Sequence, residues 1–342
     1  MTATQFKEYG DPDVLQLVET GEPHAGPGEI RIAVRAAGVN PTDWKFRAGY
    51  LREKVPLSLP AGSGLDAAGI VDELGDGADG AALGDAVFGT GTSTYAEYAV
   101  LTSWVRKPDG LSVAEAAGYP VPVAPARRIM DRAGVKAGQT ILISGASGGV
   151  GSAAVQFARA RGARVIATAS EANQGYLKKL GATPTTYGDG LVERVRDLAP
   201  GGIDAALDIA GSGVIPELIE LTGNPSKVIS IADFTAGAHG AQASTGYGDP
   251  SAALAEAARL FAAGQLHIPV ARTFTLSQAP DAHKASQAGH VAGRTVIVID
   301  LQPGAGRRRG LSTGSRWEPS PLCRADCCSP RPSAMSAPLR QR

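Results

Sequence analysis

The residues with the clearest chemistry form a glycine-rich segment in mid-chain, Gly145-Ala146-Ser147-Gly148-Gly149-Val150-Gly151. The apolar run 140–144 precedes it and an alanine-rich stretch follows it, which predicts a strand, a tight turn and a helix in that order. Glycines allow a sharp turn and a close backbone approach to a phosphate, and the helix start offers free N–H groups and a positive dipole end. The candidate residues for binding the diphosphate of a dinucleotide are therefore Ala146, Gly148, Gly149, Val150 and Gly151.

The elements that must position this turn alternate between strands and helices from about residue 123 to 269. Short apolar runs predict strands, and apolar residues at helical spacing predict helices. The predicted strands after the turn are 164–168, 183–187, 203–209 and 227–231, and the predicted helices are 150–161, 174–180, 191–198 and 252–263. This alternation implies a parallel sheet with both faces covered.

Another domain must precede the turn, because the turn lies far from the N-terminus. Short strands with turn signals are predicted there at 29–35, 69–74 and 85–89. After residue 269 the pattern returns to β character and ends in a strand at 295–299, which we expect to rejoin the first domain. The predicted domains are 1–122 with 270–301, and 123–269.

Composition limits the class of protein. The 342 residues are enough for two domains, and 43% apolar and 19% charged residues are typical of a globular protein. Eight of the 33 basic and two of the 33 acidic side chains lie from Gln302 onward, so the rest carries 25 basic and 31 acidic groups. That balance gives no electrostatic footprint for nucleic acid.

The chain has no run long enough to span a bilayer and no signal-peptide core at its start, so we expect a cytoplasmic protein without a membrane partner. Residues 302–342 lose all hydrophobic periodicity and are predicted to be a disordered basic tail. All three cysteines lie in this tail, and three thiols there give no rigid four-ligand metal site.

Five motifs in order resemble those of the medium-chain dehydrogenase/reductase superfamily, in its zinc-independent, quinone oxidoreductase-like branch. The motifs occupy residues 36–45, 62–69, 84–88, 145–151 and 289–294, and the resemblance covers about residues 1 to 300. It implies an α/β protein with a GroES-like, β-rich catalytic domain and a Rossmann domain, which is a doubly wound parallel sheet.

The resemblance also implies that no metal is bound. Where the zinc-dependent alcohol dehydrogenases carry a cysteine and a His-Glu pair, this chain has Asn40-Pro41 and Ser63-Gly64. Hydride transfer involving simple alcohols usually needs zinc as a Lewis acid. We therefore expect activated electrophiles as substrates, namely quinones or α,β-unsaturated carbonyls.

The cofactor preference depends on the residue about 20 positions beyond the glycines, where NAD sites place an acidic residue. Here that position holds Ser170, which favours NADPH, although Glu171 follows immediately. The resemblance makes Lys178 and Tyr187 further partners of the 2′-phosphate. The alternative is that Ser170 only caps a helix that begins near Ala172.

For catalysis, the resemblance places Asn40 beside the nicotinamide and Tyr50 in a loop that often contributes to the substrate pocket. Either side chain could donate a hydrogen bond to the substrate oxygen. The alternatives are that Asn40-Pro41 only forms a turn and that Tyr50 only packs. Asp43 and Lys45 are interpreted as a local surface pair.

Two features have no assigned role. Pro125 occupies a place near the nicotinamide where the family commonly has threonine, at the predicted start of a helix, where proline is acceptable. The five histidines are interpreted as structural or exposed, so a water or Tyr50 is left as the proton donor.

These observations predict an NADPH-dependent reductase acting on a small electrophile, with a homodimer as a further expectation from the resemblance. An enoyl-thioester reductase is the alternative within the same class. A nucleotide-binding sensor or RNA-binding module with little catalysis is the alternative from another class.

Overall fold

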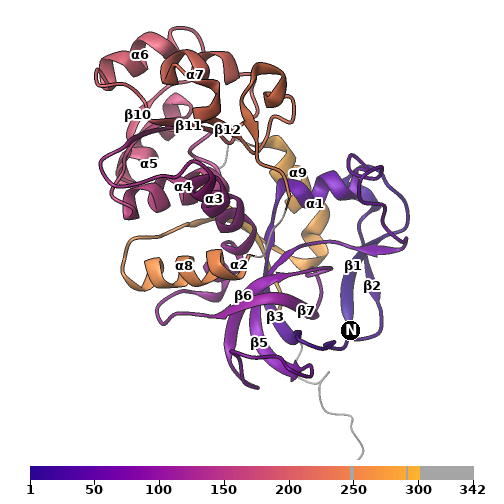
Figure 1. Cartoon of the computed structure of the whole chain (residues 1–342). Coiled ribbons are helices and arrows are strands. Elements are labelled where there is room, and N and C mark those ends of the chain that lie inside the picture. The colour runs from indigo at the N-terminus through magenta and orange to yellow at the C-terminus, as the bar shows by residue number, and fades with distance from the viewer. Residues whose placement is uncertain (247–249, 290–291, 301–342) are drawn as a thin grey trace, which may run out of the picture. The chain divides into compact units, whose positions relative to one another are not determined.

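The glycine turn follows a central strand of a six-stranded parallel sheet in the computed structural model of the protein (Figure 1). The structure describes residues 1–246, 250–289 and 292–300. The predicted tail 302–342, with its cysteines, and His290 of the last motif lie outside these residues.

The strand order of this sheet is β10-β9-β8-β11-β12-β13, and every neighbouring pair is parallel. The strands are β8 (Thr140–Ser144), β9 (Arg164–Thr168), β10 (Thr183–Thr185), β11 (Ala205–Asp208), β12 (Val228–Ser230) and β13 (Gln242–Ala243). The direction of winding reverses between β8 and β11. This is the order of a doubly wound dinucleotide-binding fold, which binds its ligand at that reversal.

Helices cover both faces of the sheet because successive strand residues point to opposite sides. Ile141 and Ile143 pack with residues of α3, α4 and α8, whereas Leu142 and Ile166 pack with α6 and α7. The helices are α3 (Pro120–Arg132), α4 (Gly149–Ala160), α5 (Gln174–Lys179), α6 (Leu191–Leu198), α7 (Ile215–Thr222) and α8 (Ser251–Ala262).

The second architecture is β-rich, as predicted. Strands β3, β5, β6 and β7 pair in succession, and β7 also pairs with β3, which closes a ring. The strands are β1 (Thr2–Phe6), β2 (Gln16–Glu19), β3 (Ile30–Val39), β4 (Ala61–Gly62), β5 (Asp66–Leu74), β6 (Ala86–Gly91), β7 (Tyr98–Arg106), β14 (Val270–Thr275) and β15 (Arg294–Val298). The helices are α1 (Pro41–Arg47), α2 (Val113–Ala117) and α9 (Ala279–Ala288).

The last described strand returns to the first part of the chain. β15 pairs antiparallel with β3, with Val296 opposite Gly38. This return places Arg294, the first residue of β15, beside the end of β3. The sheet register therefore determines which side chains meet there.

Two segments differ from the sequence expectation. Residues 279–288, expected to be β, form α9, because Ala279, Ala282 and His283 are buried at helical spacing. α3 begins at Pro120, so the predicted domain boundary at residue 123 falls within this helix. No helix among the described residues is long and apolar enough to cross a membrane.

Candidate functional site

The glycine turn has the backbone geometry of a phosphate site. Gly145 has a φ of +77°, and a Cβ there would lie 2.9 Å from Ala210 in the loop after β11. Gly148 is the N-cap residue of α4, which has no side-chain cap and no acidic residue in its first turn. The first N–H groups of α4 are therefore available to an anion.

The glycines of this turn differ in the space around them. A Cβ on Gly151 would lie 2.2 Å from the carbonyl oxygen of Gly145, so this glycine allows α4 to pack against the turn. A Cβ on Gly148 would meet no atom closer than 4.0 Å. The turn thus leaves open space at Gly148, next to the free N–H groups.

Ala146, also predicted at the phosphate, lies in the core. Its side chain is buried and its N–H donates to the carbonyl of Thr168 at 3.0 Å. It has neither a free N–H nor an exposed side chain to offer a ligand.

The residues predicted to bind the 2′-phosphate lie at one edge of the sheet. Ser170 follows β9 and Tyr187 follows β10, and these strands are adjacent and parallel. Tyr187 is 56% exposed, and Lys178 on α5 is also exposed. The Ser170 hydroxyl makes no capping hydrogen bond to the helical turn η2 (Glu171–Asn173) that follows it, so the capping alternative finds no support in the geometry.

Asn40 lies between β3 and α1, where it is the N-cap residue of the helix, and it is 1% exposed. Its backbone N–H donates to Oδ2 of Asp43 at 2.8 Å, and the Tyr95 hydroxyl donates to the same oxygen at 2.9 Å. The interpretation of Asp43 and Lys45 as a surface pair is therefore wrong. Asp43 is buried because it accepts the backbone donor that the start of α1 leaves free.

The Asn40 side chain is bound at both ends. Its Oδ1 accepts from Nη2 of Arg294 at 2.6 Å, and its Nδ2 donates to Oδ2 of Asp66 at 3.0 Å. Arg294 Nη2 also lies 3.5 Å from that Asp66 oxygen. We call the set of Asn40, Asp43, Asp66, Tyr95 and Arg294 the Asn40 cluster.

Burial shifts the protonation of this cluster. Burial raises the pKa of Asp66 to about 7, against the opposing effects of Arg294 and the Asn40 hydrogen bond. Burial also raises the pKa of Asp43 to about 6, although Asn40 and Tyr95 donate to it. The cluster therefore contains carboxyl groups that change charge near neutral pH.

Among the described residues, Tyr50 makes no hydrogen bond, ion pair or ring contact with this cluster. It lies beyond the far end of α1, is 72% exposed and packs edge-on against Trp44, with ring centroids 6.0 Å apart. Lys45 lies over the same Trp44 ring at 5.6 Å. The two predicted catalytic residues thus flank opposite ends of one helix.

The Asn40 cluster touches the glycine turn. A Cβ on Gly149 would lie 2.9 Å from Nη1 of Arg294 and 3.3 Å from Pro122 in the first turn of α3. The N–H of Val121 in that turn donates to Oδ1 of Asp66 at 2.8 Å. The starts of α3 and α4 and the end of β3 therefore converge on the same buried charges.

Comparison with known proteins identifies the family. Residues 26–109 match the alcohol dehydrogenase GroES-like domain, and residues 149–242 match the zinc-binding dehydrogenase family. The chain is 33% identical over 244 residues to the quinone oxidoreductase of Homo sapiens, a match that covers 68% of this chain and 73% of that one. The chain belongs to the medium-chain dehydrogenase/reductase superfamily. Within it, the similarity identifies an oxidoreductase of the quinone oxidoreductase-like branch, as predicted.

Two further similar proteins are informative. The 2-methylene-furan-3-one reductase of Solanum lycopersicum is 33% identical over 228 residues, which cover 62% of this chain and 58% of that protein. A mycobacterial protein solved with NADPH is 25% identical, with a TM-score of 0.75 over 87% of this chain and all of that one. These likenesses agree with the Rossmann and GroES-like architecture described above.

Sequence reasoning missed Asp66 and Arg294 in this medium-chain dehydrogenase/reductase chain, although both lie in motifs that carried the resemblance. The pairing register of β3 with β5 and of β3 with β15 is what brings these two residues together. Gly38 on β3 pairs with Asp66 on β5, and Val39 pairs with Thr295 next to Arg294 on β15. Opposite charges on two strands that flank β3 must meet around its last residue.

The sequence predicted Pro125 at the start of a helix, but the structure places it beyond the first turn. α3 starts at Pro120, so Pro125 lies in the second turn and cannot donate an N–H to the carbonyl of Val121. The first turn, just before it, supplies the Val121 N–H that donates to Asp66. The proline thus weakens α3 close to the Asn40 cluster.

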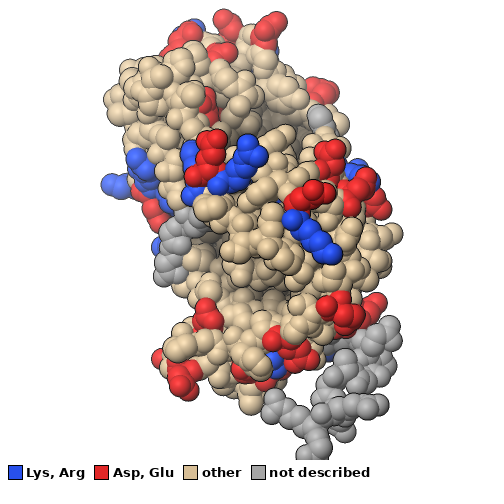
Figure 2. All heavy atoms as spheres, turned by 90° about the vertical axis from the view of Figure 1, so that its right-hand side faces the viewer, with Lys and Arg blue, Asp and Glu red and all other residues tan. Residues whose placement is uncertain are grey.

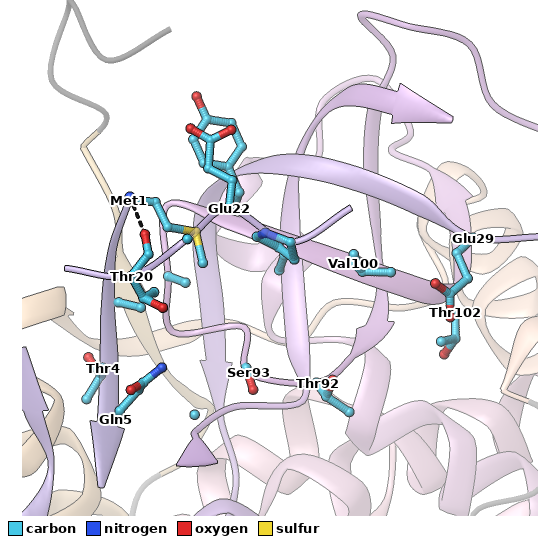
Figure 3. Close-up of a pocket in the computed structure, with 17 residues that line it drawn as sticks. Met1, Thr4, Gln5, Thr20, Glu22, Glu29, Thr92, Ser93, Val100 and Thr102 are labelled. Carbon is cyan, nitrogen blue, oxygen red and sulfur yellow. Dashed lines mark hydrogen bonds between the residues drawn. The ribbon is translucent and has the colours of Figure 1, made fainter. Parts of the chain in front are cut away.

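A cavity of about 500 Å³ lies elsewhere in the GroES-like part (Figure 3). Residues of β1, β7 and their connections line it, including Thr4, Gln5, Ser93 and Val100. Its lining includes no residue of the glycine turn or the Asn40 cluster. On the face shown in Figure 2, acidic side chains predominate at the top and bottom, and basic side chains lie among acidic ones in the middle.

Proposed function

We propose that this oxidoreductase uses NADPH, works without zinc and transfers hydride to quinones or α,β-unsaturated carbonyls. The observation that carries the proposal is the convergence of the glycine turn with the Asn40 cluster through the contact of Arg294 with Gly149. A phosphate-binding turn beside a buried hydrogen-bond donor is the arrangement that dinucleotide-dependent reduction of a carbonyl compound requires.

The residues of the turn fit a dinucleotide. The open space at Gly148 and the uncapped start of α4 would hold the diphosphate, since both lie at the strand reversal where this fold binds ligands. NADPH is preferred because the Ser170 hydroxyl is not used as a cap and carries no charge that would repel a 2′-phosphate. Lys178 supplies a cation, and Tyr187 a phenol, for that phosphate. The mycobacterial relative solved with NADPH supports this choice.

In the proposed reaction, the bound nicotinamide supplies a hydride to the substrate. Asn40 donates a hydrogen bond to the substrate oxygen as negative charge develops there. Its Nδ2 carries two hydrogens: one is donated to Asp66 at 3.0 Å, and the side chain also hydrogen-bonds to Asp43. The second hydrogen is the donor that we assign to the substrate.

Zinc-free chemistry agrees with this assignment. Arg294 binds the Asn40 amide oxygen and Asp66 accepts from the amide nitrogen, at a position where zinc-dependent relatives carry a cysteine. A conjugated carbonyl or quinone is electrophilic enough to accept hydride with hydrogen bonding alone. The names of the human and tomato relatives, a quinone oxidoreductase and a reductase of a methylene furanone, support these two substrate classes.

The test is a comparison of turnover with NADPH and with NADH across a quinone, a small enal and an enoyl thioester. The proposal expects NADPH oxidation with the quinone or the enal and a lower kcat/KM with NADH. Faster turnover of the enoyl thioester would instead assign an enoyl-thioester reductase. Tight NADPH binding without oxidation by any acceptor would contradict the enzyme and indicate a nucleotide-binding sensor.

A further inference from the structure

Opposite charges determine the orientation of the Asn40 amide. The amide oxygen faces the Arg294 guanidinium at 2.6 Å, and the amide nitrogen faces the Asp66 carboxyl at 3.0 Å. A flipped amide would direct N–H groups at a cation and a carbonyl oxygen at a carboxylate, so each contact would become repulsive. Both charged side chains are buried, with side-chain exposures of 6% and 0%, so water does not screen these contacts.

The backbone of Asn40 is held as well. Its N–H is bound to Asp43, which Tyr95 holds from the other side. Gly38, two residues earlier, allows the approach, because a Cβ there would lie 2.9 Å from Oδ2 of Asp66 and 2.4 Å from the carbonyl oxygen of Ala117. The backbone of Asn40 is therefore held by Asp43 of its own helix, and its rotamer by Asp66 and Arg294 on two other strands.

We propose that Asp66 and Arg294 are positioning residues for the reduction: they hold the Asn40 amide so that its second N–H, which is not donated to Asp66, faces the substrate oxygen. The inference rests on the role given to Asn40 in the proposed function. Neither charged residue needs to touch the substrate, since both act through Asn40. Arg294 also touches Gly149, so the same guanidinium connects the donor to the dinucleotide turn.

The arrangement requires an ionised Asp66. Its carboxyl accepts from Asn40 Nδ2 and Val121 N–H and lies beside Arg294 Nη2. A proton on either oxygen would compete with one of these donors. The other titratable groups that face Asp66 are Asp43 and the Tyr95 phenol, and Asp43 raises the pKa of Asp66 further.

The test combines pH profiles with a double-mutant cycle. Asp66→Asn keeps the shape of the side chain but replaces an acceptor oxygen with a donor. It should lower kcat by about tenfold or more, because a mispositioned oxyanion donor loses much of its effect. The KM for NADPH should change less than kcat. The wild-type kcat should fall below about pH 7, where Asp66 becomes protonated, and this decline should be absent from the variant.

Asp72→Asn is the matched control. It makes the same chemical change on the same strand, β5, but at a partly exposed acid that pairs with Arg31 at 2.9 Å. Its kcat and pH profile should equal those of the wild type. Arg294→Lys keeps the positive charge with a different reach, and it should lower kcat as Asp66→Asn does, which provides a second route if Asp66→Asn folds poorly.

The cycle with Asn40→Ala distinguishes the possible failures. If Asp66 acts through Asn40, adding Asp66→Asn to Asn40→Ala should cause no further loss of kcat. The positioning role would be overturned if the losses in kcat of the two single variants multiplied in the double variant. It would also be overturned if the wild-type kcat did not decline near pH 7. An Asn40→Ala enzyme with full kcat would instead overturn the role of Asn40 in the proposed function.

Discussion

At the scale of single residues, the site depends on charged side chains that are buried. Asp66 and Arg294 cost free energy to desolvate, and such groups persist only where partners compensate them. Here the partners are the Asn40 amide and a helix N–H. At the cofactor, by contrast, Ser170 is partly exposed and uncharged, and its hydroxyl is the group that meets the 2′-position in our proposal.

Ser170→Asp tests the cofactor preference at this scale. The new carboxylate should weaken NADPH binding by about 1–3 kcal/mol through repulsion of the 2′-phosphate and loss of a hydrogen bond. Fluorescence titration with NADPH and NADH measures the change. Ser170→Ala, which removes only the hydroxyl, should show a smaller loss. Equal NADPH affinity in all three proteins would show that Ser170 does not contact the phosphate.

At the scale of elements, α4 must pack closely against the glycine turn and must also leave space for a phosphate. Gly151 allows the packing, and Gly148 leaves the space. Gly151→Ala should destabilise the fold by about 1–3 kcal/mol, because its Cβ would lie 2.2 Å from a backbone carbonyl that has little freedom to move. Gly148→Ala should leave the melting temperature nearly unchanged, since Gly148 has a φ of −75° and open space around it. It should nevertheless weaken NADPH binding about tenfold or more by filling the phosphate space. Thermal melts and NADPH titrations measure both effects, and an equal loss of affinity without destabilisation in both variants would contradict this division.

Helix α3 carries a second prediction at this scale. Pro125→Ala restores an N–H donor to the Val121 carbonyl and should stabilise the protein by up to about 2 kcal/mol. Proline inside a helix loses a hydrogen bond and clashes with the preceding turn, and this cost exceeds the stabilisation from restricting the unfolded chain. Pro120→Ala is the control, because Pro120 begins α3, where proline is favourable. Urea denaturation measures both. A loss of stability in Pro125→Ala would mean that the helix has adapted to the proline.

At the scale of the whole molecule, the returning segment 270–300 connects the end of the described chain to its beginning. β15 pairs with β3, and α9 carries His283, whose Nδ1 accepts from Nε of the buried Arg47 on α1 at 3.2 Å. Burial, and then the Arg47 charge, lower the pKa of His283 to about 3 from 6.5. The neutral imidazole is thus part of the contact between distant segments.

This contact predicts how stability depends on pH. Between pH 6.5 and 3 the unfolded chain takes up a proton that the folded chain excludes, so acid favours unfolding. The His283 contribution should decrease stability by up to about 1.4 kcal/mol per pH unit below pH 6.5. His283→Gln, which keeps an acceptor for Arg47, should show a shallower decline in urea unfolding over this range. Parallel curves for the two proteins would contradict the prediction.

The sequence predicted much of this organisation, because period and turn chemistry are local. The helix 191–198 and the strand 164–168 have the predicted bounds, and the glycine turn starts a helix as expected. The placement of Asp43, Asp66 and Arg294 depends on register between strands far apart in sequence, which no local pattern contains. Helix α9 was missed because its buried face consists of two alanines and a histidine, a weak hydrophobic signal.

The central claim is that NADPH bound at the glycine turn reduces an activated electrophile beside Asn40. Its most direct test is single-turnover mixing of NADPH-loaded protein with a quinone, following the absorbance of the reduced nicotinamide. We expect a rapid loss of that absorbance in the wild type and a loss at least tenfold slower in Asn40→Ala. A wild-type protein that binds NADPH but retains the full absorbance with every quinone and enal would contradict the proposed reduction.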